Sequence, residues 1–173
     1  MNTLQLLEEI RGIAQNGLHY SKNEYDQERY NRLLDLCCQK YSDILGLDLE
    51  IVLKIFLKDT GHITPKIGVN SAIFDHDKLL ITKRLEDKSW ELPGGWAELG
   101  EAPCQTAERE LKEETSIKIK AINVIDVFTR LPGDFNQTFT SYHILYDCII
   151  IEGDFRPSNE TTEMMFIDNS NIN

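Results

Sequence analysis

Apolar residues in the first third of the chain recur every three or four positions, which is the spacing of one face of an α-helix. Asn2 and Gln5 resemble a capping box at the start of the first such stripe, and we expect this helix to end at Gly17. The stripe consists of Leu4, Leu7, Ile10 and Ala14.

A second stripe predicts a longer helix, which begins at a capping pair, Ser21 with Glu24, and ends at Gly46. Its apolar face consists of Tyr30, Leu33, Leu34, Cys37, Tyr41 and Ile44. A third, shorter helix is expected from Asp48 towards Gly61. Because each helix has one apolar face, it must pack on its neighbours, on the rest of the chain or on a second copy. The pattern favours a small all-helical module over residues 1–63 that acts as a scaffold or dimerisation unit.

From residue 64 the pattern changes to short apolar runs separated by turn residues, which is typical of strands. A glycine-rich turn is expected at Gly94 and Gly95, followed by a helix from Pro103 whose apolar stripe is Cys104, Ala107 and Leu111. Mixed strands around one helix fit an α/β class with an α/β/α sandwich, in a second domain over residues 64–173. The strands are expected at 67–74, 79–83, 90–92, 121–129, 139–151 and 164–168.

Composition narrows the functional classes. The chain has 173 residues, 41% of them hydrophobic, and a net charge of −11, so a groove for nucleic acid, which needs clustered Lys and Arg, is not expected. No window approaches the ~20 apolar residues of a membrane helix, and the first residues lack a signal pattern, which predicts a cytoplasmic protein. The four cysteines show no metal spacing and are expected to be reduced thiols.

Carboxylates crowd one side of the predicted helix from Pro103. At about 100° per residue, Glu110 and Glu114 lie nearly above one another, with Glu113 beside them. Three carboxylates in this arrangement repel one another, and Arg109 can hold only one or two of them. A divalent cation, Mg²⁺ or Mn²⁺, suits such oxygen ligands, whereas the alternative is an ordinary solvated acidic face.

The spacing decides between these two interpretations. Gly95 is followed after five residues by Glu101, and after seven more by the run from Arg109 to Ile117. This arrangement resembles the signature of Nudix hydrolases, with Ser116 where the family has glycine. The helical start resembles the N-terminal region of family enzymes that hydrolyse CDP-choline or ADP-ribose. The resemblance implies Mg²⁺-dependent hydrolysis, by metal-activated water, of a nucleoside diphosphate linked to a group X. The alternatives are a nucleoside triphosphate house-cleaning enzyme and a non-catalytic nucleotide sensor.

The resemblance also implies roles for individual residues. Metal ligands would be Glu110, Glu113, Glu114 and the carbonyl of Gly95. The catalytic base would be Glu110 or one of two residues in a late loop, Glu160 and Glu163. Positions that shape the motif would be Gly94, Glu98, Glu101 and Arg109, the last two paired to hold the loop against the helix.

Substrate contacts and assembly follow from weaker signals. Trp96 is a candidate to stack on a base or on X, and Arg84 can reach a phosphate or pair with a glutamate of the motif. Trp90 is expected in the core, and His143 is expected as a packed strand residue without a catalytic role. The partners are then a nucleoside diphosphate–X substrate and, through apolar helix faces, a second copy of the chain in a homodimer.

Overall fold

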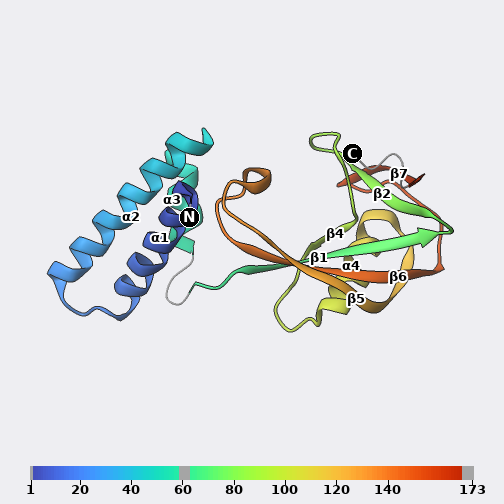
Figure 1. Cartoon of the computed structure of the whole chain (residues 1–173), viewed down its shortest axis with the longest axis horizontal. Coiled ribbons are helices and arrows are strands. Elements are labelled where there is room, and N and C mark those ends of the chain that lie inside the picture. Colours follow the sequence, from blue (N-terminus) through green and yellow to red (C-terminus); the bar gives the residue numbers. More distant parts are fainter. Residues whose placement is uncertain (1, 59–62, 169–173) are drawn as a thin grey trace. The chain divides into compact units, whose positions relative to one another are not determined.

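The chain forms two compact units, and the computed structural model describes residues 2–58 and 63–168. The first unit contains the residues up to Lys66 together with the segment Arg130–Ser141. The second unit contains Ile67–Thr129 and the residues from Tyr142 onward. Figure 1 labels the helices of the first unit and, in the second unit, helix α4 and every strand except β3. The domain limits expected from the sequence stay a prediction.

The first helix, α1 (Thr3–Tyr20), begins at the predicted capping box, in which Asn2 accepts from the Gln5 N–H at 2.9 Å. It continues past Gly17, so the expected end at this glycine is wrong. A β-carbon at Gly17 would lie 2.4 Å from the ring of Tyr30. The glycine therefore admits the close approach of the next helix and does not terminate α1.

The second helix, α2 (Glu24–Leu45), is capped by Asn23, whose side chain accepts from two backbone N–H groups of the first turn. The predicted cap at Ser21 is wrong because this residue follows the last turn of α1. Gly46 ends α2 as predicted, in a left-handed conformation with φ of 66°. The third helix, α3 (Leu49–Lys58), follows, and Gly61 lies outside the described residues.

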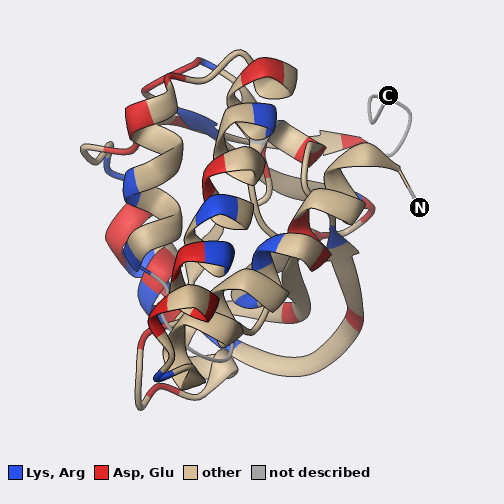
Figure 2. Cartoon of the chain, turned by 90° about the vertical axis from the view of Figure 1, so that its left-hand side faces the viewer, with Lys and Arg blue, Asp and Glu red and all other residues tan. Residues whose placement is uncertain are grey.

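The three helices bury their apolar stripes together, with Tyr41 and Phe56 meeting edge to face at 5.0 Å between ring centroids. The segment Arg130–Ser141 joins this unit through Thr140, whose N–H and hydroxyl both donate to the Glu8 carboxylate. Acidic and basic residues are interspersed along the helices in front in Figure 2. The buried cluster consists of Leu7, Ala14, Leu34, Cys37, Cys38, Tyr41, Val52 and Phe56.

The second unit is built on a seven-stranded mixed sheet, counted over the described residues. Five strands are hydrogen-bonded in the order β3-β2-β1-β6-β5, while β4 pairs with β1 and β7 pairs with β2. The predicted strands all form, with small shifts at their ends. Their bounds are β1 Lys66–Asp75, β2 Lys78–Arg84, β3 Trp90–Glu91, β4 Gly94–Trp96, β5 Lys118–Arg130, β6 Ser141–Glu152 and β7 Thr161–Asp168.

The glycine-rich stretch forms strand β4, so the prediction of a simple turn is wrong. β4 pairs antiparallel with β1, with Gly94 opposite Asn70 and Gly95 opposite Val69. Gly94 has a φ of +155°, and a β-carbon there would lie 2.1 Å from the Val69 carbonyl oxygen. Only glycine lets the two backbones approach this closely.

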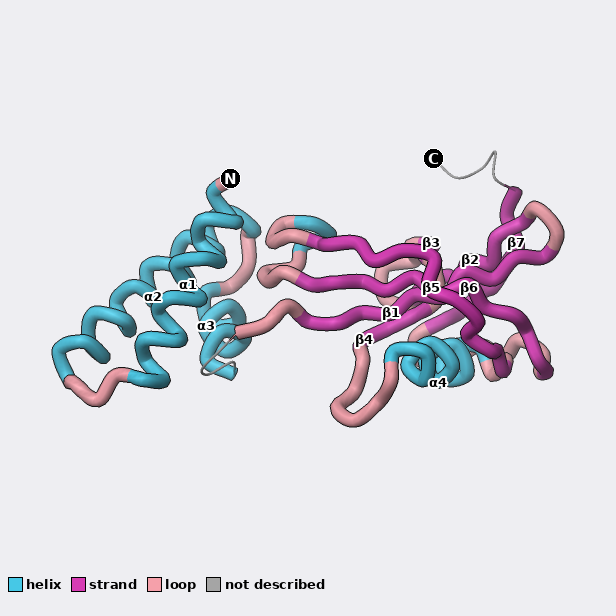
Figure 3. The backbone as a smooth tube through the Cα atoms, turned by 60° about the horizontal axis from the view of Figure 1, so that its bottom comes forward, coloured by secondary structure: helices cyan, strands magenta, loops and turns pink. Residues whose placement is uncertain are grey.

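Helix α4 (Pro103–Thr115) lies against the sheet beside β4 (Figure 3). Leu111 of α4 packs with Ile73 and Leu80 in the core of this unit. At the end of α4, Ser116 adopts a left-handed conformation with φ of 66°, at the position where the signature that the sequence resembles has glycine.

Two further sequence expectations are settled by the fold. Trp90 is 38% exposed, so its expected place in the core is wrong; its β3 strand lies beside β2, where Lys83 Nζ is 5.5 Å from the indole centroid. All four cysteines are free, as predicted. Over the described residues, none of the helices has the length and apolar character needed to cross a membrane.

Candidate active site

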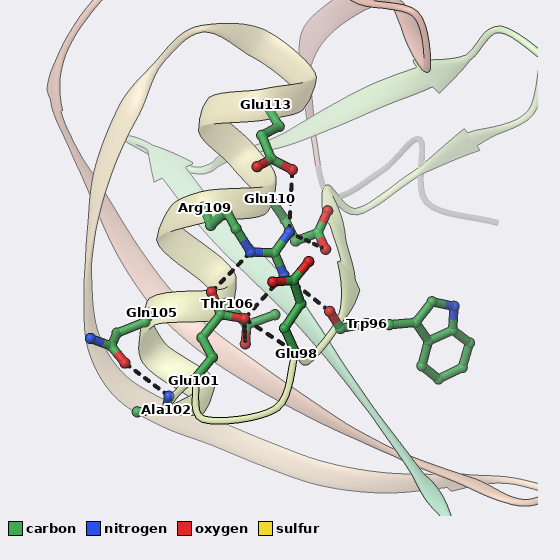
Figure 4. A network of polar contacts seen from close by, with 9 residues as sticks. All are labelled: Trp96, Glu98, Glu101, Ala102, Gln105, Thr106, Arg109, Glu110 and Glu113. Carbon is green, nitrogen blue, oxygen red and sulfur yellow. Dashed lines mark hydrogen bonds and ion pairs between the residues drawn. The ribbon is translucent and has the colours of Figure 1, made fainter.

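Arg109 is the hub of the polar network where β4 meets α4 (Figure 4). Its Nη1 donates to Glu110 at 2.9 Å and to Glu113 at 3.2 Å. Its Nη2 donates to the Trp96 carbonyl at 3.1 Å. One guanidinium thus ties the end of β4 to two carboxylates of α4, which offsets part of their mutual repulsion.

Glu101 forms the predicted ion pair with Arg109. Arg109 Nε and Nη2 donate to the two carboxylate oxygens of Glu101 at 2.9 and 3.0 Å, which is a bidentate pair. The Thr106 hydroxyl donates to the same carboxylate at 2.7 Å. The bonds from Arg109 and then from Thr106 lower the pKa of Glu101 to about 2. The pair fastens the loop before α4 onto the helix.

The carboxylate of Glu110 lies against the backbone of Gly95. A β-carbon on Gly95 would come within 2.3–2.5 Å of three carboxylate atoms of Glu110. Any other residue at Gly95 would displace Glu110. The absence of a side chain at Gly95 therefore leaves space for the Glu110 carboxylate. Burial raises the pKa of Glu110, although the bond from Arg109 opposes that shift.

Glu114 is a buried carboxylate, with 6% of its surface exposed. Oε1 accepts from the Gly94 N–H at 3.3 Å, whereas Oε2 is buried and has no hydrogen-bond partner among the residues that the structure describes. Burial raises the pKa of Glu114 to about 8. Burying a carboxylate with an unpaired oxygen costs free energy unless the group is protonated or has a cation beside it. Glu113, by contrast, has 62% of its side chain exposed.

Arg109 and the three carboxylates of α4, Glu110, Glu113 and Glu114, line a cavity of about 700 Å³. Glu98 and Glu160 also face it, and Glu160 is close enough to raise the pKa of both Glu110 and Glu114. Glu163 does not line it. The prediction that Glu163 lies in a loop is wrong, because it belongs to β7 and pairs with Lys83 at 2.8 Å across the sheet.

Arg84 lines the same cavity from the β2 end. It pairs with Glu91 at 3.6 Å and with Glu86 at 3.2 Å, and mainly the charge of Glu91, with a smaller contribution from Glu86, raises the pKa of Arg84. Among the residues described, the carboxylates that pair with Arg84 therefore lie outside the acidic face of α4. The other predicted role of Arg84, contact with a substrate phosphate, stays a prediction.

The residues present fit a hard divalent cation. Carboxylate oxygens of Glu110 and Glu114, with the carbonyl of Gly95, are the donor types that Mg²⁺ prefers, and Glu114 Oε2 has no other partner. Within residues 2–58 and 63–168, however, no three acidic, His or Cys side chains already converge as a formed metal site. Arg109 bonds to Glu110 and Glu113 in this state. The ligand set stays a prediction.

Comparison with known proteins decides the family. A NUDIX domain model matches residues 64–168, and a model described as "UDP-X-like, N-terminal oligomerisation domain" matches residues 2–56. The chain belongs to the Nudix family. It is 30% identical over 164 residues to YjhB of Bacillus subtilis (strain 168), provisionally named an ADP-ribose pyrophosphatase, covering 94% of this chain and 79% of YjhB.

Two solved structures agree with this assignment. A UDP-X diphosphatase matches 95% of this chain and 81% of its own, with 27% identity and a TM-score of 0.57. An ADP-ribose pyrophosphatase from Streptococcus suis 89-1591 matches 63% of this chain and 78% of its own, with 28% identity and a TM-score of 0.55. The Nudix chain described here is accordingly a pyrophosphohydrolase with a Nudix fold.

The sequence did not predict the role of Thr106, which donates a hydrogen bond to Glu101. It also did not predict which residues lie next to Trp96. The His143 ring lies 5.6 Å from the indole of Trp96, and its Nδ1 is 3.0 Å from the Asn70 side-chain oxygen. These residues lie on three different strands, so no local spacing in the sequence indicates that they meet. For Thr106, the one available signal in the sequence was its position, five residues after Glu101 and one turn into the predicted helix.

Proposed function

We propose that this Nudix enzyme hydrolyses the diphosphate linkage of a nucleoside diphosphate–X compound, with ADP-ribose and CDP-choline as the leading candidates. The observation that carries this proposal is the buried, partnerless Glu114 oxygen beside Glu110 and the glycines of β4. ADP-ribose is supported by the names of the relatives from Bacillus subtilis and Streptococcus suis. CDP-choline rests on the sequence resemblance alone.

In this proposal Glu110, Glu113, Glu114 and the Gly95 carbonyl hold Mg²⁺, or Mn²⁺ in its place. The cation supplies charge neutralisation on the diphosphate and a lower pKa for a water molecule. The bidentate pair of Arg109 with Glu101 would keep the loop in place while Glu110 and Glu113 serve as ligands. Glu114 would serve as a ligand in its carboxylate form, which a neighbouring cation favours.

Glu160 is the best placed of the late acids to accept a proton from the attacking water. It faces the cavity together with Glu110 and Glu114, and it raises the pKa of both. Glu163 pairs with Lys83, and neither residue is among those described as lining the cavity. The water adds to one phosphorus as the bridging P–O bond breaks, and the products are a nucleoside monophosphate and phosphorylated X.

A substrate panel tests the proposal. Purified enzyme would be mixed with ADP-ribose, CDP-choline, UDP-glucose and a nucleoside triphosphate, with Mg²⁺, with Mn²⁺ and with a chelator. We expect the diphosphate–X compounds to yield nucleoside monophosphate, detected by chromatography, only when metal is present. Turnover of the triphosphate alone, or equal rates with chelator, would overturn the proposal.

We further propose that the helical unit joins two copies of the chain in a homodimer. The description of the model that matches residues 2–56, an N-terminal oligomerisation domain, supports this assembly. Several apolar side chains on these helices are also exposed, among them Ile13, Leu36 and Ile51. Such side chains, where they gather, favour contact with another protein surface.

A further inference from the structure

Three aromatic side chains from three different strands form a row across the sheet beside the acidic cavity. His143 of β6 stacks on Phe128 of β5, with ring centroids 5.4 Å apart and planes within 16°. On its other side, His143 lies 5.6 Å from the indole of Trp96 on β4. Both separations are within the range of favourable aromatic contacts.

Gly68 of β1 makes this row possible. In the β1–β4 pairing Gly68 lies directly opposite Trp96, so the two positions share one face of the sheet. A β-carbon on Gly68 would lie 2.5–3.0 Å from three atoms of the His143 ring. The missing side chain therefore lets the imidazole lie over β1 and reach the indole.

The His143 ring of this row is held in place by Asn70. Asn70, two residues after Gly68 and therefore on the same face, places its Oδ1 3.0 Å from His143 Nδ1. His143 is buried, whereas Trp96 is 46% exposed. A fixed ring thus supports an indole that keeps half of its surface available to a ligand.

Trp96 links this row to the site of the reaction. Its carbonyl accepts the hydrogen bond from Arg109, while its indole points away from the acidic side chains (Figure 4). The residue also lines the cavity that contains Glu110 and Glu114. A ligand whose phosphates lie at the carboxylates can therefore extend a neighbouring planar group over the indole.

We propose that Trp96, supported by His143 and Phe128, is the stacking platform for the nucleobase of the substrate. This inference rests on the proposed function, since it assigns the nucleoside end of the same diphosphate substrate to one side of the cavity. A planar base matches an indole face, and stacking on an aromatic side chain tolerates different bases because each has a π face. The platform therefore predicts recognition of a nucleoside without strict choice of base.

Fluorescence gives a direct test in a Trp90→Phe variant, in which Trp96 is the remaining tryptophan of the two in the chain. Trp90 lies outside both the row and the cavity lining. AMP, UMP and CMP would be titrated beside ribose 5-phosphate, which carries a phosphate but no base. We expect the three nucleotides to quench Trp96 and ribose 5-phosphate to leave it unchanged. Equal quenching by ribose 5-phosphate would overturn the proposal.

Kinetics separate stacking from a general structural role. Trp96→Leu should raise KM for whichever of ADP-ribose and CDP-choline the wild type hydrolyses by about 5- to 150-fold, the range expected for loss of one stacked base. The value of kcat should stay near wild type, because stacking is the same in the ground and transition states. Trp96→Phe, which keeps a ring, should recover most of the affinity. Unchanged KM in Trp96→Leu, or a loss of kcat that Trp96→Phe does not repair, would contradict the platform.

Gly68→Ala tests the supporting ring without touching the indole. It should displace His143 and weaken nucleotide quenching of Trp96, while binding of ribose 5-phosphate stays the same. Gly12→Ala is the matched control, because nothing lies within 4 Å of a β-carbon there. Wild-type quenching in Gly68→Ala would refute the role of His143. If the wild type hydrolysed no diphosphate–X compound, the proposed function would fail, while the nucleotide titration would still decide the platform.

Discussion

Burial of Glu114 gives the metal-free enzyme a pH-dependent stability. Because the folded-state pKa is about 8, whereas the ordinary pKa of a glutamate is 4.5, the folded state holds this proton more tightly than the unfolded chain. The contribution is fully present below about pH 4.5 and is lost as pH rises through about 8. We expect the Tm of the metal-free protein to fall across this window. The free energy of unfolding should fall by about 1.4 kcal/mol for each unit of difference between the two pKa values.

Glu114→Gln checks the cause of this slope. The amide has no titrating proton, so its Tm should change less with pH between 5 and 8 than the wild-type Tm. The wild type should regain stability at pH 8 when Mg²⁺ is added, since a ligand of the folded state stabilises it, and the variant should regain less. We expect at least ~10²-fold slower turnover in the variant. Wild-type turnover in Glu114→Gln would remove Glu114 from the predicted metal ligands.

Glu160 and Glu163 offer a matched pair for locating the catalytic base. Glu160 faces the cavity, while Glu163, three residues later, pairs with Lys83. Glu160→Gln should lower kcat by about 10²- to 10⁴-fold, the usual contribution of a positioned acid or base. Glu163→Gln should change kcat by less than about threefold, because an exposed ion pair contributes little. The reverse order of effects, measured under saturating substrate, would place the base on β7.

Ser116 ends helix α4 in a conformation that suits glycine. Its φ of 66° is left-handed, which costs a non-glycine residue about 1 kcal/mol or more. Ser116→Gly should therefore stabilise the protein by about 0.5–1 kcal/mol, part of the gain being offset by the greater freedom of glycine in the unfolded chain. Urea denaturation would measure the change. Ser116→Ala is the control, and it should bring no gain because alanine meets the same strain.

Local patterns predicted the helices and most strands because periodicity and caps depend on neighbouring residues. The box at Asn2, the start of α4 at Pro103 and the Glu101–Arg109 pair were all accessible in this way. Strand β4 was missed since three residues containing two glycines carry no strand pattern, and pairing with β1 decides their conformation. The contact between His143 and Trp96 depends on the register of distant strands, which one sequence does not encode locally.

The whole chain is expected to form a homodimer through its helical unit. At 100° per residue, Leu33, Leu36 and Ile44 lie within about 80° of one another around α2, and each is exposed. We expect light scattering after size exclusion to give twice the mass of one chain. Leu36→Glu should shift the population towards monomer, because a charge would have to lose its water at the interface.

Asn31→Glu is the control for this change. Asn31 is exposed on the same helix, about 140° around the axis from Leu36. A glutamate at this position therefore adds the same charge outside the expected contact. Its mass should remain that of the wild type. A monomeric wild type, or equal dissociation by the two variants, would contradict a dimer built on this face of α2. Because the carboxylates and the aromatic row all lie in the second unit, Leu36→Glu should retain its hydrolytic rate per chain even as it dissociates.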